Sequence, residues 1–252
     1  MEDNLDFVMN IGEQMLICGA EVHRVEDSIM RMCKAYGATR TDVFIITSSM
    51  VVTVFKNDKS YTQTRRITSI GTDLEKLHKL NELSRKICSS DIEETDSQLR
   101  EEFDLIKKYK TYPLFIQCLC YCAISGSFAL FFGGGISDAM ISAFIGAIVK
   151  LLSHFLERTD SNKIFTKFLL SFTATALSYS AFLLSVISSV DKVMIGIIMT
   201  LIPGIGLTNA LRDLFSGDSI AAILRAVEAA LLALAIAAGY FLFVFISGGI
   251  VL

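Results

Sequence analysis

Residues 114–136 read LFIQCLCYCAISGSFALFFGGGI, a run of 23 residues that contains no charged side chain. At about 1.5 Å of rise per residue, a helix of this length is long enough to cross the roughly 30 Å of hydrocarbon in a bilayer. Pro113 precedes the run, at a position where its missing N–H costs a helix little. The run therefore predicts a first membrane-spanning helix.

The charge on either side of this run is distributed unevenly. Charged side chains make up 35 of the first 110 residues but only 14 of the following 142, and the mean hydropathy of the chain is +0.54. This contrast predicts a membrane protein, with a soluble domain at 1–110 and a transmembrane domain at 111–252. We expect the transmembrane domain to be a five-helix α bundle, with helices at about 114–136, 139–156, 164–188, 193–211 and 220–251.

The basic residues of the connections predict which side of the membrane the soluble domain occupies. Lys and Arg cluster at 107–110, at 150–167 and at 212–225, and the intervening connections hold almost none. Because cytoplasmic loops carry the excess of Lys and Arg, we expect residues 1–110 on the cytoplasmic side of the membrane. The acidic start Met1-Glu2-Asp3 does not resemble a cleavable signal.

The soluble part predicts a small α+β domain. Apolar residues follow helical spacing over 5–36 with one interruption, and they are β-branched or aromatic over 42–48 and 50–56. A turn at 57–59 precedes a third predicted strand, 60–67. Two further helices are expected, from Thr72 or Asp73 through Ile87 and over 94–108.

Several function classes are disfavoured by the sequence. A net charge of −3 and a pI of about 5.7 argue against nucleic acid as a partner, and six scattered cysteines make no disulfide framework. Phosphate-binding loops and hydrolase signatures are absent, which argues against an ATP-driven pump and against an enzyme. Cys118, Cys120 and Cys122 fall in one span without a histidine, so we expect packing residues, and we predict neither metal nor cofactor.

The fourth predicted span is interrupted. It reads MTLIPGIGLTNALRD over 199–213, and Pro203 cannot donate a hydrogen bond to the carbonyl of Met199. Gly204 and Gly206 loosen the next turn, and a broken helix inside a membrane offers bare peptide groups to a polar solute. The alternative is a proline kink that only improves packing.

Ionisable residues gather just after this break. Ionisable groups in or near spans usually have a function, and five of them follow within 25 residues of Pro203: Arg212, Asp213, Asp218, Arg225 and Glu228. Their i,i+3 spacing also allows Arg225 and Glu228 to form an interfacial pair at the cytoplasmic mouth. A second dense stretch, GAEVHRVE over 19–26, is either a solvated face with a Glu21–Arg24 pair or a surface that contacts the membrane part.

Several of these stretches together resemble the bacterial threonine/serine exporter (ThrE) family. They are Gly19-Ala20-Glu21, Arg24-Val25-Glu26, Gly37, Pro203-Gly204, Asn209-Ala210, Arg212-Asp213, Gly217-Asp218 and Arg225. A soluble domain followed by five spans also looks like the YjjP-like subunits of that family, which are implicated in succinate export. Full-length members carry about twice as many spans, so the resemblance implies a second small membrane subunit or a homo-oligomer.

We therefore predict a secondary-active export permease subunit, surrounded by membrane lipid, that moves threonine, serine or a dicarboxylate such as succinate. Arg212 or Arg225 would neutralise the solute carboxylate, and Asp213 or Glu228 would carry a coupling proton or orient the arginine. Two alternatives stay open: a passive metabolite channel, and a membrane-anchored sensor or enzyme that acts through residues 1–110. The predicted substrate-binding residues are Pro203, Gly204, Gly206, Thr208, Asn209, Arg212, Asp213, Arg225 and Glu228.

Overall fold

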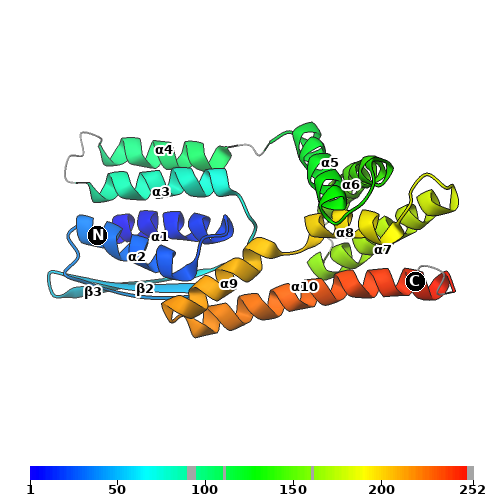
Figure 1. Cartoon of the computed structure of the whole chain (residues 1–252). Coiled ribbons are helices and arrows are strands. Elements are labelled where there is room, and N and C mark those ends of the chain that lie inside the picture. The colour runs from blue at the N-terminus through cyan, green and yellow to red at the C-terminus, as the bar shows by residue number, and fades with distance from the viewer. Residues whose placement is uncertain (90–94, 110–111, 160–161, 249–252) are drawn as a thin grey trace. The chain divides into compact units, whose positions relative to one another are not determined.

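A computed structural model describes residues 1–89, 95–109, 112–159 and 162–248. Within these ranges the chain forms ten helices and three strands, and it separates into two compact units (Figure 1). The N-terminal unit consists of residues 1–111 and 204–227, and the second unit consists of residues 112–203 and 228–252. The predicted boundary at 110 differs from this division, because residues 204–227 join the N-terminal unit.

The N-terminal unit contains the α+β structure expected from the sequence. Its sheet is antiparallel in the order β1-β2-β3, and its elements are α1 (Glu2–Ile17), α2 (Val22–Ala35), β1 (Arg40–Ile46), β2 (Ser49–Lys56), β3 (Lys59–Arg66), α3 (Leu74–Cys88) and α4 (Asp96–Lys108). Helices α1 and α2 lie between the sheet and the α3–α4 pair, as Figure 1 shows. The start of the predicted helix over 94–108 lies outside the described residues at Glu94.

Burial in this unit follows the two periodicities of its sequence. On β2, Met50, Val52 and Val54 alternate with more exposed residues, so one face of the sheet is buried against the helices. Leu5 and Met9, one turn apart on α1, are fully buried in the same core. The amide of Lys76 donates to the side chain of Asp73, which caps α3 at the residue where a cap was expected.

The second unit consists of helices that approach each other closely at small residues. They are α5 (Leu114–Phe131), α6 (Ile136–Glu157), α7 (Lys163–Leu183), α8 (Val190–Leu201) and the larger part of α10 (Ser219–Ile246). A Cβ added at Gly196 on α8 would lie 2.5 Å from the Ser125 carbonyl oxygen on α5, and one added at Gly239 on α10 would clash with the Phe168 carbonyl on α7. Glycine therefore permits both helix contacts.

Three of the described helices, α5, α6 and α10, are each long and apolar enough to cross a membrane. Helices α8 and α9 (Gly204–Ser216) add a fourth span only if they count together as one interrupted span. Helix α7 is not among these candidate spans, and Lys167 and the hydroxyl side chains lower its mean hydropathy. The membrane character is thus confirmed, whereas the predicted count of five spans is not.

Candidate functional site

The turn between α1 and α2 exposes two backbone carbonyl groups. Gly19 has a φ of +92°, and the amides of Gly19 and Ala20 donate to the carbonyls of Leu16 and Met15. This pattern is a Schellman motif, in which glycine provides the left-handed residue that ends a helix. A side chain at Gly19 would also lie 2.8 Å from the carbonyl oxygen of Gly71. The turn directs the Gly19 and Ala20 carbonyls away from α1.

Side chains of α9 and α10 bind this turn within the N-terminal unit. The Asn209 amide donates to the Gly19 carbonyl at 2.9 Å, and the Arg225 guanidinium donates through Nη2 to the Ala20 carbonyl at 2.7 Å. The Val22 amide, one of the unpaired N–H groups at the start of α2, donates to Asp213 Oδ1 at 3.0 Å. We call these three backbone groups and the side chains of Asn209, Asp213 and Arg225 the junction clasp.

A buried ion pair lies at the centre of the junction clasp. Arg225 Nε lies 3.1 Å from Asp213 Oδ2, and the two side chains are 6 % and 0 % exposed. The N–H direction is too oblique for a hydrogen bond, so the contact is an ion pair alone. Loss of one partner from a buried pair costs about 3–5 kcal/mol, because the other charge stays buried without compensation. The pair therefore makes the clasp sensitive to either substitution.

Arg212 lies at the exposed rim of the clasp, where it pairs with Glu21. The Arg212 side chain is 61 % exposed and that of Glu21 is 24 % exposed, so solvent screens the pair and its stabilisation is only about 0–1 kcal/mol. The expected Glu21–Arg24 pair on α2 is not formed, since Glu21 is directed to α9 instead. Of the two arginines in this region, Arg212 can therefore exchange its partner at the lower cost in free energy.

The other predicted site residues have separate surroundings. The helix break expected at Pro203 is present, since α8 ends at Leu201 and α9 begins at Gly204. The Thr208 hydroxyl donates to the Gly204 carbonyl of its own helix, and a Cβ added at Gly204 or Gly206 would meet no atom within 4 Å.

Pro203 and Glu228 belong to the second unit. Within that unit, Glu228 Oε1 lies 3.8 Å from Lys163 Nζ, and both side chains are exposed. The suggested pair between Arg225 and Glu228 is wrong, because Arg225 pairs with Asp213.

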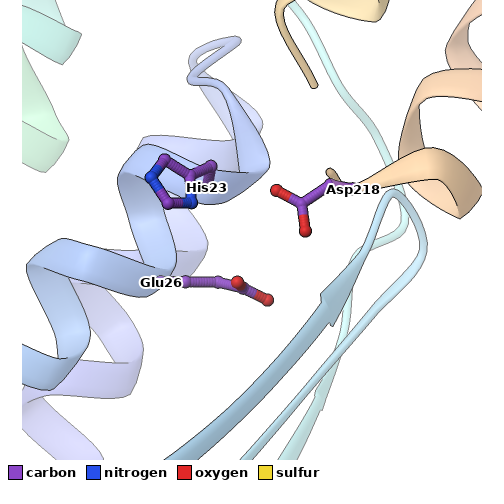
Figure 2. A group of neighbouring side chains, drawn as sticks. All are labelled: His23, Glu26 and Asp218. Atoms are coloured by element: carbon purple, nitrogen blue, oxygen red, sulfur yellow. The ribbon is translucent and has the colours of Figure 1, made fainter. Parts of the chain in front are cut away.

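A second group of side chains lies beside the clasp and was not predicted. His23 and Glu26 extend from α2 toward Asp218, which lies in the turn between α9 and α10 (Figure 2). Glu26 Oε1 accepts the Ile45 amide at 3.0 Å. Burial raises the pKa of Glu26 above 4.5, and the nearby charge of Asp218 raises it further. Each residue is ordinary by itself in the sequence, so no local signal could have joined them.

Comparison with known proteins identifies the family. Residues 6–246 match the family model ThrE, described as "Putative threonine/serine exporter". The chain belongs to the ThrE family. The resemblance drawn from the sequence is therefore confirmed, and membership places the chain among membrane transport proteins.

Two curated ThrE relatives share the same name, "Probable succinate transporter subunit YjjP". The protein from Klebsiella aerogenes is 24 % identical over 230 residues, which cover 88 % of this chain and 85 % of the relative. The protein from Escherichia coli K12 is also 24 % identical over 230 residues, covering 88 % of this chain and 86 % of the relative. No solved structure matches the chain.

Proposed function

We propose that the chain is a subunit of a secondary-active export permease for a small carboxylate-bearing metabolite. The observation that carries the proposal is the set of polar groups that follows the break at Pro203, where Asn209, Arg212 and Asp213 lie on α9 and converge with Arg225. An interrupted helix near ionisable groups is a recurrent way to bind a polar solute in transporters. Family membership and the names of the relatives support the same reading.

Arg212 is the residue that we propose to contact the solute carboxylate. Its guanidinium is exposed and is paired with Glu21, so an incoming carboxylate would replace one carboxylate by another at little cost. Gly204 and Gly206 would present open backbone to the solute, with Thr208 beside them. The buried Asn209 amide already donates to the Gly19 carbonyl, so its proposed role is to position α9. The sequence is the basis for keeping two further residues in the proposed site. Pro203 would break the helix, and Glu228 would carry a coupling proton.

Arg225 and Asp213 have a different proposed role, which is to position α9. Both side chains are buried, and Arg225 is already engaged by Asp213 and by the Ala20 carbonyl. A solute would have to break a buried ion pair to reach either one, which is expensive. Of the two arginines considered from the sequence, Arg212 is therefore the better candidate for solute contact.

We further propose that residues 1–110 are cytoplasmic, that the protein lies in a bacterial inner membrane, and that it works with a second small membrane subunit or with further copies of itself. The distribution of Lys and Arg supports the orientation. The relatives are named as subunits of a succinate transporter, which supports an assembly and places a dicarboxylate beside threonine and serine as a candidate solute.

The test is export from proteoliposomes loaded with labelled succinate, threonine or serine, with and without a candidate second subunit. We expect saturable efflux that responds to an imposed proton gradient, and we expect Arg212→Gln to abolish it while Arg212→Lys keeps part of it. Lys59→Gln, at the first residue of β3 in the same unit, is the control. Linear efflux that ignores the gradient would favour a passive channel, and normal efflux by Arg212→Gln would refute the proposed site.

A hollow in the N-terminal unit favours the alternative of a sensor. It has a volume of about 360 Å³ and lies between α2 and α3, where Arg24, Arg31 and Arg85 line it together with Asn81 and Ser84. Arg31 already pairs with Asp27, which also lines the hollow, so Arg24 and Arg85 are the guanidinium groups that suit a small anion. The test is binding of labelled succinate to the protein and to the double variant Arg24→Gln/Arg85→Gln. If the double variant loses this binding but keeps normal efflux, the domain senses a metabolite. Unchanged binding in the double variant would exclude this hollow.

A further inference from the structure

The side chains of His23, Glu26 and Asp218 form a group of donors in the N-terminal unit. One ligand atom from each residue can be chosen so that all three atoms lie within 4.8 Å of one another. His23 and Glu26 are one turn apart on α2 and share a face, and Asp218 follows the left-handed Gly217 at the end of α9 (Figure 2). Among the described residues, this is the one such group of three.

One oxygen of this group is buried without a hydrogen-bond partner. Asp218 Oδ2 has lost contact with solvent, and within the described residues it accepts no hydrogen bond. A buried carboxylate oxygen that has lost its water is costly unless a donor or a cation replaces the water. The second unexplained group is the His23 imidazole, which has no described hydrogen bond although it lies within reach of two carboxylates.

The neighbouring charges do not supply the missing cation. Arg225 is engaged by Asp213, and Arg212 is engaged by Glu21. These pairs engage the two arginines of the clasp and its rim, and among the described residues His23 is the basic side chain grouped with Glu26 and Asp218.

We propose that His23, Glu26 and Asp218 bind a divalent cation of the zinc or manganese class. One imidazole nitrogen and two carboxylate oxygens are ligands that these ions accept, whereas the imidazole disfavours magnesium and calcium. Ligands at about 2.0–2.2 Å from one ion lie roughly 3–4 Å apart, and the three ligand atoms already lie within 4.8 Å of one another. His23 is exposed and can rotate, and water would fill the remaining coordination positions.

A bound ion would connect two segments that are far apart in the sequence. His23 and Glu26 belong to α2, whose first amide is already held by Asp213, and Asp218 belongs to the turn between α9 and α10. The ion would therefore stabilise the same α2–α9 contact as the junction clasp. The expectation from the sequence was that the chain binds no metal, because only the cysteines were weighed as ligands.

The test uses the full-length protein in detergent, treated with a chelator and then dialysed. We expect one equivalent of Zn²⁺ to bind in competition with a chromophoric chelator, and one Mn²⁺ to give a bound signal in electron paramagnetic resonance. Mg²⁺ should compete poorly. His23→Ala and Asp218→Asn should each weaken Zn²⁺ binding by at least about tenfold. His78→Ala and Glu82→Gln, an exposed histidine and glutamate pair on α3, are the matched controls.

His23→Ala keeps the test decisive if Asp218→Asn does not fold, because the His23 side chain is exposed. The proposal is overturned if the wild-type protein binds neither ion, or if His23→Ala binds Zn²⁺ as tightly as the controls do. Binding is measured without transport, so its failure is distinct from a failure of the permease proposal.

Discussion

Replacing Arg225 by methionine is expected to destabilise the N-terminal unit severely. The substitution keeps most of the side-chain volume but leaves Asp213 Oδ2 buried without its counter-ion, and it removes the donor of the Ala20 carbonyl. The loss of one partner from a buried pair costs about 3–5 kcal/mol. At about 3 °C per kcal/mol for a unit of this size, the midpoint of thermal unfolding should fall by roughly 10–15 °C.

Arg212→Met is the control for this change, because it removes the same kind of side chain from an exposed pair on the same face. Its cost should be about 0–1 kcal/mol, or no more than roughly 3 °C. The chain contains no tryptophan, so the transition is best followed by circular dichroism. Hydrogen exchange gives a local measure, since Arg225→Met should accelerate exchange at the Val22 amide, which Asp213 holds.

A double substitution separates the buried charge from the loss of packing. Asp213→Asn keeps an oxygen for the Val22 amide but removes the orphaned charge, so adding it to Arg225→Met should recover part of the stability. We expect a coupling energy of at least about 2 kcal/mol in the double-mutant cycle. If Arg225→Met behaves like Arg212→Met in both assays, the argument for a buried, stabilising clasp is wrong.

Three further predictions concern stability. Gly19→Ala should cost at least about 1 kcal/mol in thermal unfolding, because its φ is +92° and its Cβ would approach a backbone oxygen to 2.8 Å, whereas Gly71→Ala, whose Cβ meets its nearest atom at 3.6 Å, should cost less. Glu26→Gln should remove a pH dependence of stability. Because the pKa of Glu26 is raised, the folded state binds the proton more tightly than the unfolded state, so wild-type stability falls as pH rises above about 4.5. Thermal unfolding midpoints of wild type and Glu26→Gln, measured in chelator from pH 4.5 to 7.5, should therefore converge at the acidic end. Gly196→Ala should abolish a monodisperse peak in size-exclusion chromatography because its Cβ would collide with α5, while Gly206→Ala, beside open space, should be neutral or stabilising. Equal effects within either glycine pair, or parallel pH curves, would contradict these arguments.

The local features of this fold were predictable from the sequence because their causes are local. The turn at Asn57 and Asp58, both at positive φ, and the cap at Asp73 depend on residues within four positions of one another. The break at Pro203 was also predictable, since a missing N–H interrupts a helix wherever it stands. Apolar length alone predicted α5, α6 and α10 as candidate spans.

The contacts of the candidate site were not predictable in the same way. Local spacing suggested that Glu21 would pair with Arg24 and Arg225 with Glu228. Instead, Glu21 pairs with Arg212, which lies 191 residues later in the chain, and Arg225 pairs with Asp213 on the preceding helix. Two participants are backbone carbonyls, at Gly19 and Ala20, which carry no side-chain signature. The site residues named from the sequence therefore stay a prediction, and their pairing had to come from the structure.

The N-terminal unit is assembled from both halves of the chain, and this sets the order in which it can mature on the ribosome. Residues 1–111 emerge first, yet Ala221, which is buried in their apolar core, and the side chains that bind the α1–α2 turn are translated more than 90 residues later. Most of the apolar helices must leave the exit tunnel before this core can close. In a nascent chain arrested before residue 227, the α1–α2 turn would lack the side chains that bind it. A chaperone or a membrane insertase would therefore encounter this exposed surface during every round of synthesis.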